Sequence, residues 1–149
     1  MALASFGNAQ KITQARELVG RNELRQAEVI VRDILQSEPQ NAAAQHLMAT
    51  IAFRTGHAEP AAQWLRSALE LDKNNADYWN DLGAVYAATG KLDESLDCCE
   101  RVLTLAPTFA DGFYNYGYLL FQLGLIDEAL GSFKKAASLR PSFAEAHSF

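Results

Sequence analysis

The residues with the most potential for chemistry are three histidines, two adjacent cysteines and two pairs of neighbouring carboxylates. His46, His57 and His147 lack metal-ligand spacing with one another or with the cysteines, and a zinc site needs three or four ligands that converge. We therefore expect no metal and no cofactor. The sequence also lacks a glycine-rich phosphate loop, a nucleophile elbow and a Ser/His/Asp arrangement. These absences predict a protein that is not an enzyme.

The two cysteines, Cys98 and Cys99, are the only ones in the chain. Neighbouring residues in a helix point about 100° apart, so these thiols do not form a mutual disulfide. We expect a reducing, cytoplasmic compartment. A redox role for these thiols stays open as an alternative, without a resolving cysteine at CxxC spacing. Cys99 is predicted to be a small core residue, and Cys98 to be partly exposed.

The carboxylate pairs Asp93–Glu94 and Asp127–Glu128 lie 34 residues apart, each just before an expected helix. Negative charge there stabilises the positive amino-terminal end of a helix. We therefore interpret both pairs as helix-capping residues and not as general acids and bases. The two tryptophans, Trp64 and Trp79, are predicted to pack against neighbouring helices.

The net charge of −5 is unevenly distributed along the 149 residues. Residues 1–75 are neutral, whereas residues 76–149 carry five basic and ten acidic side chains. An acidic surface repels phosphate groups, so we expect no nucleic-acid partner and no membrane partner, but a protein or peptide of basic or amphipathic character. No segment approaches the roughly 20 apolar residues that span a bilayer, and the amino end does not resemble a secretory signal.

A period of 34 residues organises the chain. The windows 8–41, 42–75, 76–109 and 110–143 align without a gap, residues 1–7 lead into them, and residues 144–149 begin a fifth. One column holds only small residues, as expected where two helix backbones approach closely: Ala15, Ala49, Gly83 and Gly117. A second small column and a bulky column follow in the same register: Ala27, Ala61, Ser95 and Ala129; then Val31, Leu65, Cys99 and Phe133.

Turn residues recur with the same period. Asn22, Gly56, Gly90 and Gly124 share a column that suits the left-handed conformation ending a helix. Pro39, Pro107 and Pro141 share another, where proline stops the second helix of a unit. Each window is therefore predicted to be a pair of helices.

These columns resemble the tetratricopeptide repeat family. The residues that carry the resemblance in the third window are Trp79, Leu82, Gly83, Tyr86, Gly90, Cys99 and Pro107. Those in the fourth are Phe113, Gly117, Gly124, Ala129, Phe133, Ala136 and Pro141. The resemblance implies an all-α, right-handed superhelix of antiparallel helix pairs, with four units and the start of a fifth. The RNA-reading pentatricopeptide alternative is disfavoured by the acidic balance and by the aromatic and proline columns.

In such a stack the first helix of each unit lines a concave groove, and helical counting from the small column gives its residues. The side chains predicted to bind a ligand are Arg16, His46, Arg54, Asp77, Asn80, Asp81, Asp111, Tyr114, Asn115, Tyr118 and Gln122. The remaining groove positions are Ile12, Val19, Ala43, Thr50, Phe53, Ala84, Ala88, Phe121, Glu145 and Ser148.

The groove residues change from basic and apolar, through carboxylates and amides, to aromatic along the chain. Amide side chains can hydrogen-bond the backbone of an extended peptide, tyrosines supply amphipathic surface, and aspartates can receive Lys or Arg. The alternative is an ordinary solvated helix face. Some members of the family bind the terminal carboxylate of chaperones through lysines and an arginine in the groove. The groove predicted here has aspartates or neutral residues at those places, so that ligand is not expected. The asparagine ladder of protein-modifying glycosyltransferases is matched only by Asn115, with Asp81 as a near substitute and Thr13 and Leu47 as departures.

Three functions remain open. The first is a scaffold that binds a peptide or partner protein in the groove. The second is a substrate-docking arm of a larger enzyme, such as a bacterial glycosyltransferase or sulfotransferase. The third is self-association through the uncapped carboxyl-terminal end, where an apolar face lacks a neighbour. The residues expected at that end are Phe133, Ala137, Phe143 and Phe149.

Overall fold

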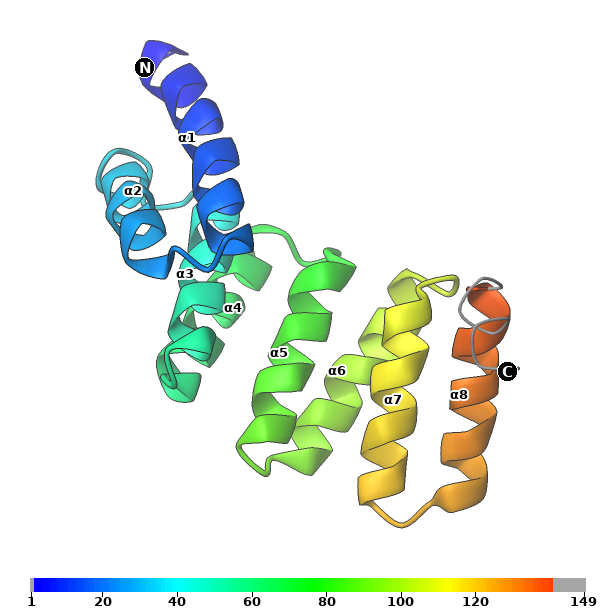
Figure 1. Cartoon of the computed structure of the whole chain (residues 1–149). Coiled ribbons are helices and arrows are strands. Elements are labelled where there is room, and N and C mark those ends of the chain that lie inside the picture. The colour runs from blue at the N-terminus through cyan, green and yellow to red at the C-terminus, as the bar shows by residue number, and fades with distance from the viewer. Residues whose placement is uncertain (1, 141–149) are drawn as a thin grey trace. The chain divides into compact units, whose positions relative to one another are not determined.

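The computed structural model describes residues 2–140, and the side chains from residue 7 onward. Every regular element in that part is a helix, which confirms the all-α prediction (Figure 1). In chain order the helices are α1 (Ala2–Gly20), α2 (Leu24–Ser37), α3 (Ala42–Arg54), α4 (Ala58–Leu71), α5 (Ala76–Ala88), α6 (Leu92–Leu105), α7 (Ala110–Gln122) and α8 (Ile126–Leu139). Residues 2–7, expected to precede the first repeat, extend its first helix. None of these helices combines the length and apolar character needed to cross a bilayer.

The helices pair in sequence order into four hairpins, α1 with α2, α3 with α4, α5 with α6 and α7 with α8. The chain divides into two compact units, residues 1–73 and residues 74–149. In the first unit α3 also packs on α1 and α2, and in the second α7 also packs on α5 and α6. Each unit therefore contains two hairpins and one junction between successive repeats.

The turn within each hairpin uses a residue with positive φ. Asn22 has φ of 60°, and Gly56, Gly90 and Gly124 have φ of 85°, 78° and 82°. The following amide reaches back to a carbonyl near the end of the first helix, as in the bond of 2.8 Å from the His57 amide to the Ala52 carbonyl. This pattern satisfies helix carbonyls that otherwise lack a donor. The predicted turn column is confirmed.

The helix amino ends are stabilised in two ways. The side-chain oxygens of Asn41 and Asn75 accept hydrogen bonds from the amides of Ala44 and Tyr78, at 3.0 and 3.2 Å. Such caps satisfy one of the four amides that lack an intrahelical acceptor. The two carboxylate pairs, predicted to lie just before these helices, lie within the first turns of α6 and α8, whose N-cap residues are Lys91 and Leu125. Negative charge in a first turn still stabilises the amino-terminal end of a helix.

The small columns lie where the two helices of a hairpin meet, and their members are buried. A Cβ added to Gly117 would lie 2.9 Å from the ring of Phe133, and one added to Gly83 would lie 3.2 Å from Cβ of Cys98. The hydroxyl of Ser95 donates to the Gly83 carbonyl at 2.8 Å. Close backbone contact, and not side-chain interdigitation alone, thus holds α5 to α6 and α7 to α8.

Two predicted groove residues of the first unit are core residues. Ile12 and Val19 are each 7% exposed and belong to a cluster with Ala15, Val31 and Leu47. The prediction that they line an open groove is wrong, because their aliphatic side chains are buried in a cluster formed by α1, α2 and α3. Burial of such side chains contributes about 1.5–3 kcal/mol each.

Both cysteines are free and buried, so the prediction that Cys98 is partly exposed is wrong. It packs at the contact of α6 with Gly83 of α5. Burial raises the pKa of Cys98 to about 12 and that of Cys99 to about 11. Both side chains are therefore neutral thiols at physiological pH and behave as small hydrophobic residues.

Candidate functional site

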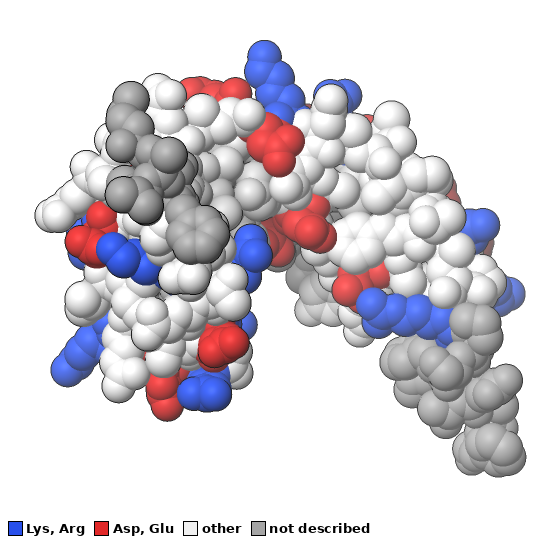
Figure 2. Space-filling model, turned by 90° about the horizontal axis from the view of Figure 1, so that it is seen from above, with Lys and Arg blue, Asp and Glu red and all other residues white. Residues whose placement is uncertain are grey.

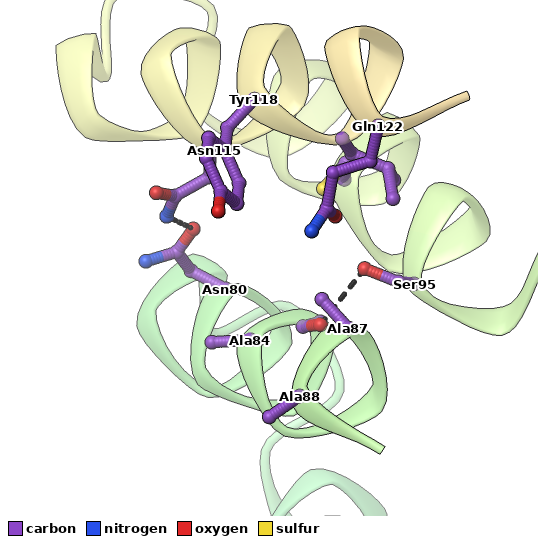
Figure 3. A pocket seen from close by; sticks show the side chains of 11 residues that line it. Asn80, Ala84, Ala87, Ala88, Ser95, Asn115, Tyr118 and Gln122 are labelled. Carbon is purple, nitrogen blue, oxygen red and sulfur yellow. Dashed lines mark hydrogen bonds between the residues drawn. The ribbon is translucent and has the colours of Figure 1, made fainter. Parts of the chain in front are cut away.

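A cavity of about 300 Å³ lies in the second unit, between the first helices of the third and fourth repeats, α5 and α7 (Figure 3). We call it the α5–α7 cavity. Its lining residues are Asn80, Gly83, Ala84, Ala87, Ala88, Ser95, Cys99, Asn115, Tyr118, Leu119 and Gln122. The volume is sufficient for one large side chain of a ligand together with adjoining backbone.

Amide side chains form one end of the cavity. The Asn115 side-chain nitrogen on α7 donates to the Asn80 side-chain oxygen on α5 at 2.9 Å. Each amide still has unused capacity, because an asparagine offers two N–H donors and an oxygen with two lone pairs. Tyr118 and Gln122 follow on the same face of α7, so polar groups continue along this wall.

The opposite wall is made of small side chains. In α5, Ala84, Ala87 and Ala88 line the cavity. The residues 34 positions later, in α7, are the much larger Tyr118, Phe121 and Gln122. Short side chains on α5 facing large ones on α7 leave an open space at the junction. The cavity therefore arises from local sequence differences on a repeated backbone.

The matching junction of the first unit is filled instead. Residues 68 positions before Asn80, Ala87 and Asn115 are the buried aliphatic residues Ile12, Val19 and Leu47. Arg54, which corresponds to Gln122, donates from its guanidinium to the Val19 carbonyl at 2.8 Å. Arg54 thus fixes α3 to the end of α1.

The α5–α7 cavity brings together four of the predicted ligand-binding residues, Asn80, Asn115, Tyr118 and Gln122. The predicted groove residues Ala84 and Ala88 also line it. Asp77 is exposed and Asp81 half-buried on α5, and neither lines the cavity. In the first unit, Arg16 is exposed on α1 and His46 is half-buried on α3.

Asp111 and Tyr114 lie elsewhere in the second unit, beside a smaller hollow of about 250 Å³. The Asp111 carboxylate accepts from the Arg140 guanidinium at 2.6 Å, so an internal cation already occupies the place expected for a ligand's basic group. The Tyr114 ring contacts the Phe133 ring with centroids 5.5 Å apart. The predicted end residues Phe143 and Phe149, and the groove residues Glu145 and Ser148, lie outside the described residues.

Ala87, Leu119 and Cys99 line the cavity but were not among the predicted groove residues. Alanine has no functional group that draws attention in a sequence. Ala87 could have been identified by its small size, because the residues at the same position of the other repeats are the larger Val19, Phe53 and Phe121.

The charged side chains do not assemble into a metal-binding cluster in the described part of the chain. No group of three or more His, Cys, Asp or Glu is positioned there to hold a metal ion. On the face shown in Figure 2, basic and acidic side chains are interspersed with extensive uncharged surface. The α5–α7 cavity is thus suited to hydrogen bonding and apolar contact.

Comparisons with known proteins agree with this description. Tetratricopeptide repeat models match residues 18–85, 76–109 and 110–143. The crystal structure of MamA has a TM-score of 0.80 at 22% identity, covering 93% of this chain and 81% of that one. The pilF protein of Pseudomonas aeruginosa has a TM-score of 0.86 at 23% identity, covering 93% and 63%.

An O-GlcNAc transferase of Thermobaculum terrenum is also similar, with a TM-score of 0.76 at 25% identity. The match covers 78% of this chain but only 22% of that enzyme. No match was found among curated protein sequences. The three repeat models together extend from residue 18 to residue 143, and the chain belongs to the tetratricopeptide repeat family.

Proposed function

We propose that this interaction scaffold binds an extended peptide of a partner protein in the α5–α7 cavity. The observation that carries the proposal is the open junction itself, in which Asn80, Ala87 and Asn115 stand where the first unit has the buried aliphatic residues Ile12, Val19 and Leu47. An apolar cavity with a few well-placed polar groups is the usual form of a binding site.

The amide pair suits the backbone of such a peptide. Asn80 retains N–H donors and Asn115 retains oxygen lone pairs beyond their mutual bond. An extended peptide presents both a carbonyl and an amide to one side, so the pair can hydrogen-bond it without regard to sequence. A side chain of the ligand would then enter the space beside Ala84, Ala87 and Ala88.

The charge of the second unit favours a peptide with basic or amphipathic character. Asp77 lies exposed in the first turn of α5, three residues before Asn80. A lysine or arginine that flanks the bound segment can approach its carboxylate. Because the carboxylate is exposed, this contact contributes mainly to association rate and selectivity and adds little to affinity.

A selection from a phage-displayed library of random peptides tests the proposal. The wild-type chain should enrich related peptides, and Ala84→Arg should abolish their binding because arginine would fill the cavity from an exposed position. The matched control is Thr104→Arg, which adds the same side chain at an exposed position of α6 that does not line the cavity. Equal binding by wild type and Ala84→Arg would refute the proposal.

A second candidate function is the docking of substrates for a linked enzyme. The similarity to part of an O-GlcNAc transferase supports it. The chain would then deliver peptides from the same cavity to a catalytic domain. Sequencing the gene downstream of the codon for Phe149 tests this candidate, since it requires a transferase domain in the same reading frame.

Self-association is a third candidate, supported by apolar side chains at the turn between α7 and α8 and on α8. Leu125, Ile126 and Leu130 are 43%, 54% and 51% exposed. Large exposed apolar side chains in a cluster are typical of an interaction surface. In sedimentation velocity experiments, the sedimentation coefficient should increase with protein concentration. The double substitution Leu125→Glu with Ile126→Glu should remove this increase.

A further inference from the structure

The first unit contains a cavity of about 410 Å³ that none of the predicted groove residues lines. We call it the Trp64 pocket. It opens to solvent and is lined by α2, α3 and α4 of the first two repeats and by the turn between α3 and α4. Its lining residues are Leu24, Arg25, Glu28, Arg32, Met48, Ile51, Ala52, Thr55, His57, Pro60 and Trp64.

The inner part of the pocket is apolar. Met48 and Ile51 are buried members of the core cluster, and Trp64 is half-buried and packs against that cluster. The indole therefore presents a rigid aromatic surface, and the methionine a deformable one, to whatever enters. Such a wall favours an aromatic or large aliphatic group.

The rim of the pocket carries positive charge from α2. Arg32 is paired with Glu28, with nitrogen and oxygen 2.9 Å apart, so these two charges offset each other. Arg25, one turn before Glu28, is exposed and has no ion pair with any described residue. His57 lies with Nδ1 3.0 Å from the Thr55 hydroxyl oxygen. One guanidinium thus remains available for a carboxylate beside the apolar wall.

The fold does not require this combination of residues. At the positions 68 residues later, Arg25 is replaced by Asp93, Arg32 by Glu100 and Trp64 by Ser132. Both units nevertheless form the same pairs of helices. The arginines and the tryptophan are therefore specific to the first unit, as expected for residues that determine a ligand preference.

We infer that the Trp64 pocket binds a peptide segment in which a carboxylate side chain adjoins an aromatic or large aliphatic one. The apolar group packs on Trp64 and Met48, and the carboxylate accepts charge-assisted hydrogen bonds from Arg25. The occupant is complementary in charge to this rim and opposite in charge to the ligand proposed for the α5–α7 cavity. The two sites lie in different units and require no common residue.

A titration of the full chain with short peptides tests this inference. The probe is a blocked pentapeptide with phenylalanine between two glutamates and alanine at each end. Binding should shift the indole N–H signal of Trp64 in a 1H–15N spectrum, with Trp79→Phe used only to assign the two indole signals. Replacing both glutamates of the probe by lysine, or its phenylalanine by alanine, should weaken binding at least about tenfold.

Arg25→Glu should weaken binding of the glutamate probe by about tenfold or more, because it replaces the available cation by an anion. Arg21→Glu is the matched control, since Arg21 is also exposed but does not line the pocket, and it should change affinity less than about twofold. Ala84→Arg should leave probe binding unchanged, which separates this site from the α5–α7 cavity. Equal binding of the lysine probe, an unshifted Trp64 signal, or equal losses from Arg25→Glu and Arg21→Glu would overturn the inference.

Discussion

The α1–α3 junction and the α5–α7 junction use the same repeat positions for different purposes. The first is closed by Ile12, Val19 and Leu47, and Arg54 links α3 to the Val19 carbonyl. The second has Asn80, Ala87 and Asn115 at the matching positions and retains a cavity of about 300 Å³. The hairpins that form these junctions pair their helices in the same way in both units.

This difference shows which positions the fold needs and which it leaves free. The buried small columns and the positive-φ turn residues are equivalent in both units. Side chains at the junction positions of the first helices change in size, polarity and burial between the units without altering the hairpins. Stability therefore depends on the hairpin contacts in both units, and additionally on the closed junction in the first. Exchanging residues between the two junctions tests whether the first contributes to stability and the second to binding.

The largest effect is expected for exchanging Leu47 and Asn115. Leu47→Asn should lower the free energy of unfolding by about 3 kcal/mol, because it removes a buried apolar side chain and introduces an amide without a matched partner. Asn115→Leu should change stability by less than about 1 kcal/mol but weaken peptide binding, since it removes the bond to Asn80. Urea denaturation of both variants provides the measurement, and similar stability losses would contradict the comparison.

An intermediate effect is expected for exchanging Arg54 and Gln122. Arg54→Gln removes the bond to the Val19 carbonyl and should cost about 1 kcal/mol of stability. Gln122→Arg should leave the melting temperature nearly unchanged, because Gln122 is exposed, while it obstructs the cavity. Thermal melts together with binding of the selected peptides distinguish the two results. A larger stability loss from Gln122→Arg than from Arg54→Gln would count against the division of roles.

The smallest effect concerns Cys99, whose counterpart in the first unit is Val31. Its pKa is raised by burial from 9.0 to about 11 in the folded chain. The neutral thiol therefore stabilises the fold fully below pH 9, and this contribution is lost as the pH rises towards 11. Cys99→Val should leave stability at pH 7 within about 1 kcal/mol and make its decline above pH 9 shallower. If the free energy of unfolding fell equally steeply between pH 8 and 11 in wild type and Cys99→Val, this account would be excluded.

Much of the fold could be predicted from the sequence because its determinants are local and periodic. Gly56, Gly90 and Gly124 mark turns through their backbone preference, and the small columns mark close helix contacts. Counting along one helix also placed Asn80 and Asn115 on neighbouring groove faces. It could not show that Asn115 bonds to Asn80, since that bond depends on the offset between two helices.

The errors share a physical cause. Helical counting assigned Ile12 and Val19 to the groove by angle alone, but both side chains are buried in the core cluster of the first unit. Cys98 was predicted to be partly exposed beside Cys99, yet it faces the glycine of the opposing helix. The Trp64 pocket was missed because three helices contribute to it, and the contribution of each to a cavity depends on the others.

The most direct test of the central claim is a methyl spectrum of alanine-labelled protein, recorded with and without a peptide enriched by the selection. Binding in the open junction should shift the signals of Ala84, Ala87 and Ala88 and leave those of Ala15, Ala27 and Ala49 in the first unit unchanged. Shifts confined to the first unit, with the three α5 alanines unaffected, would contradict the account.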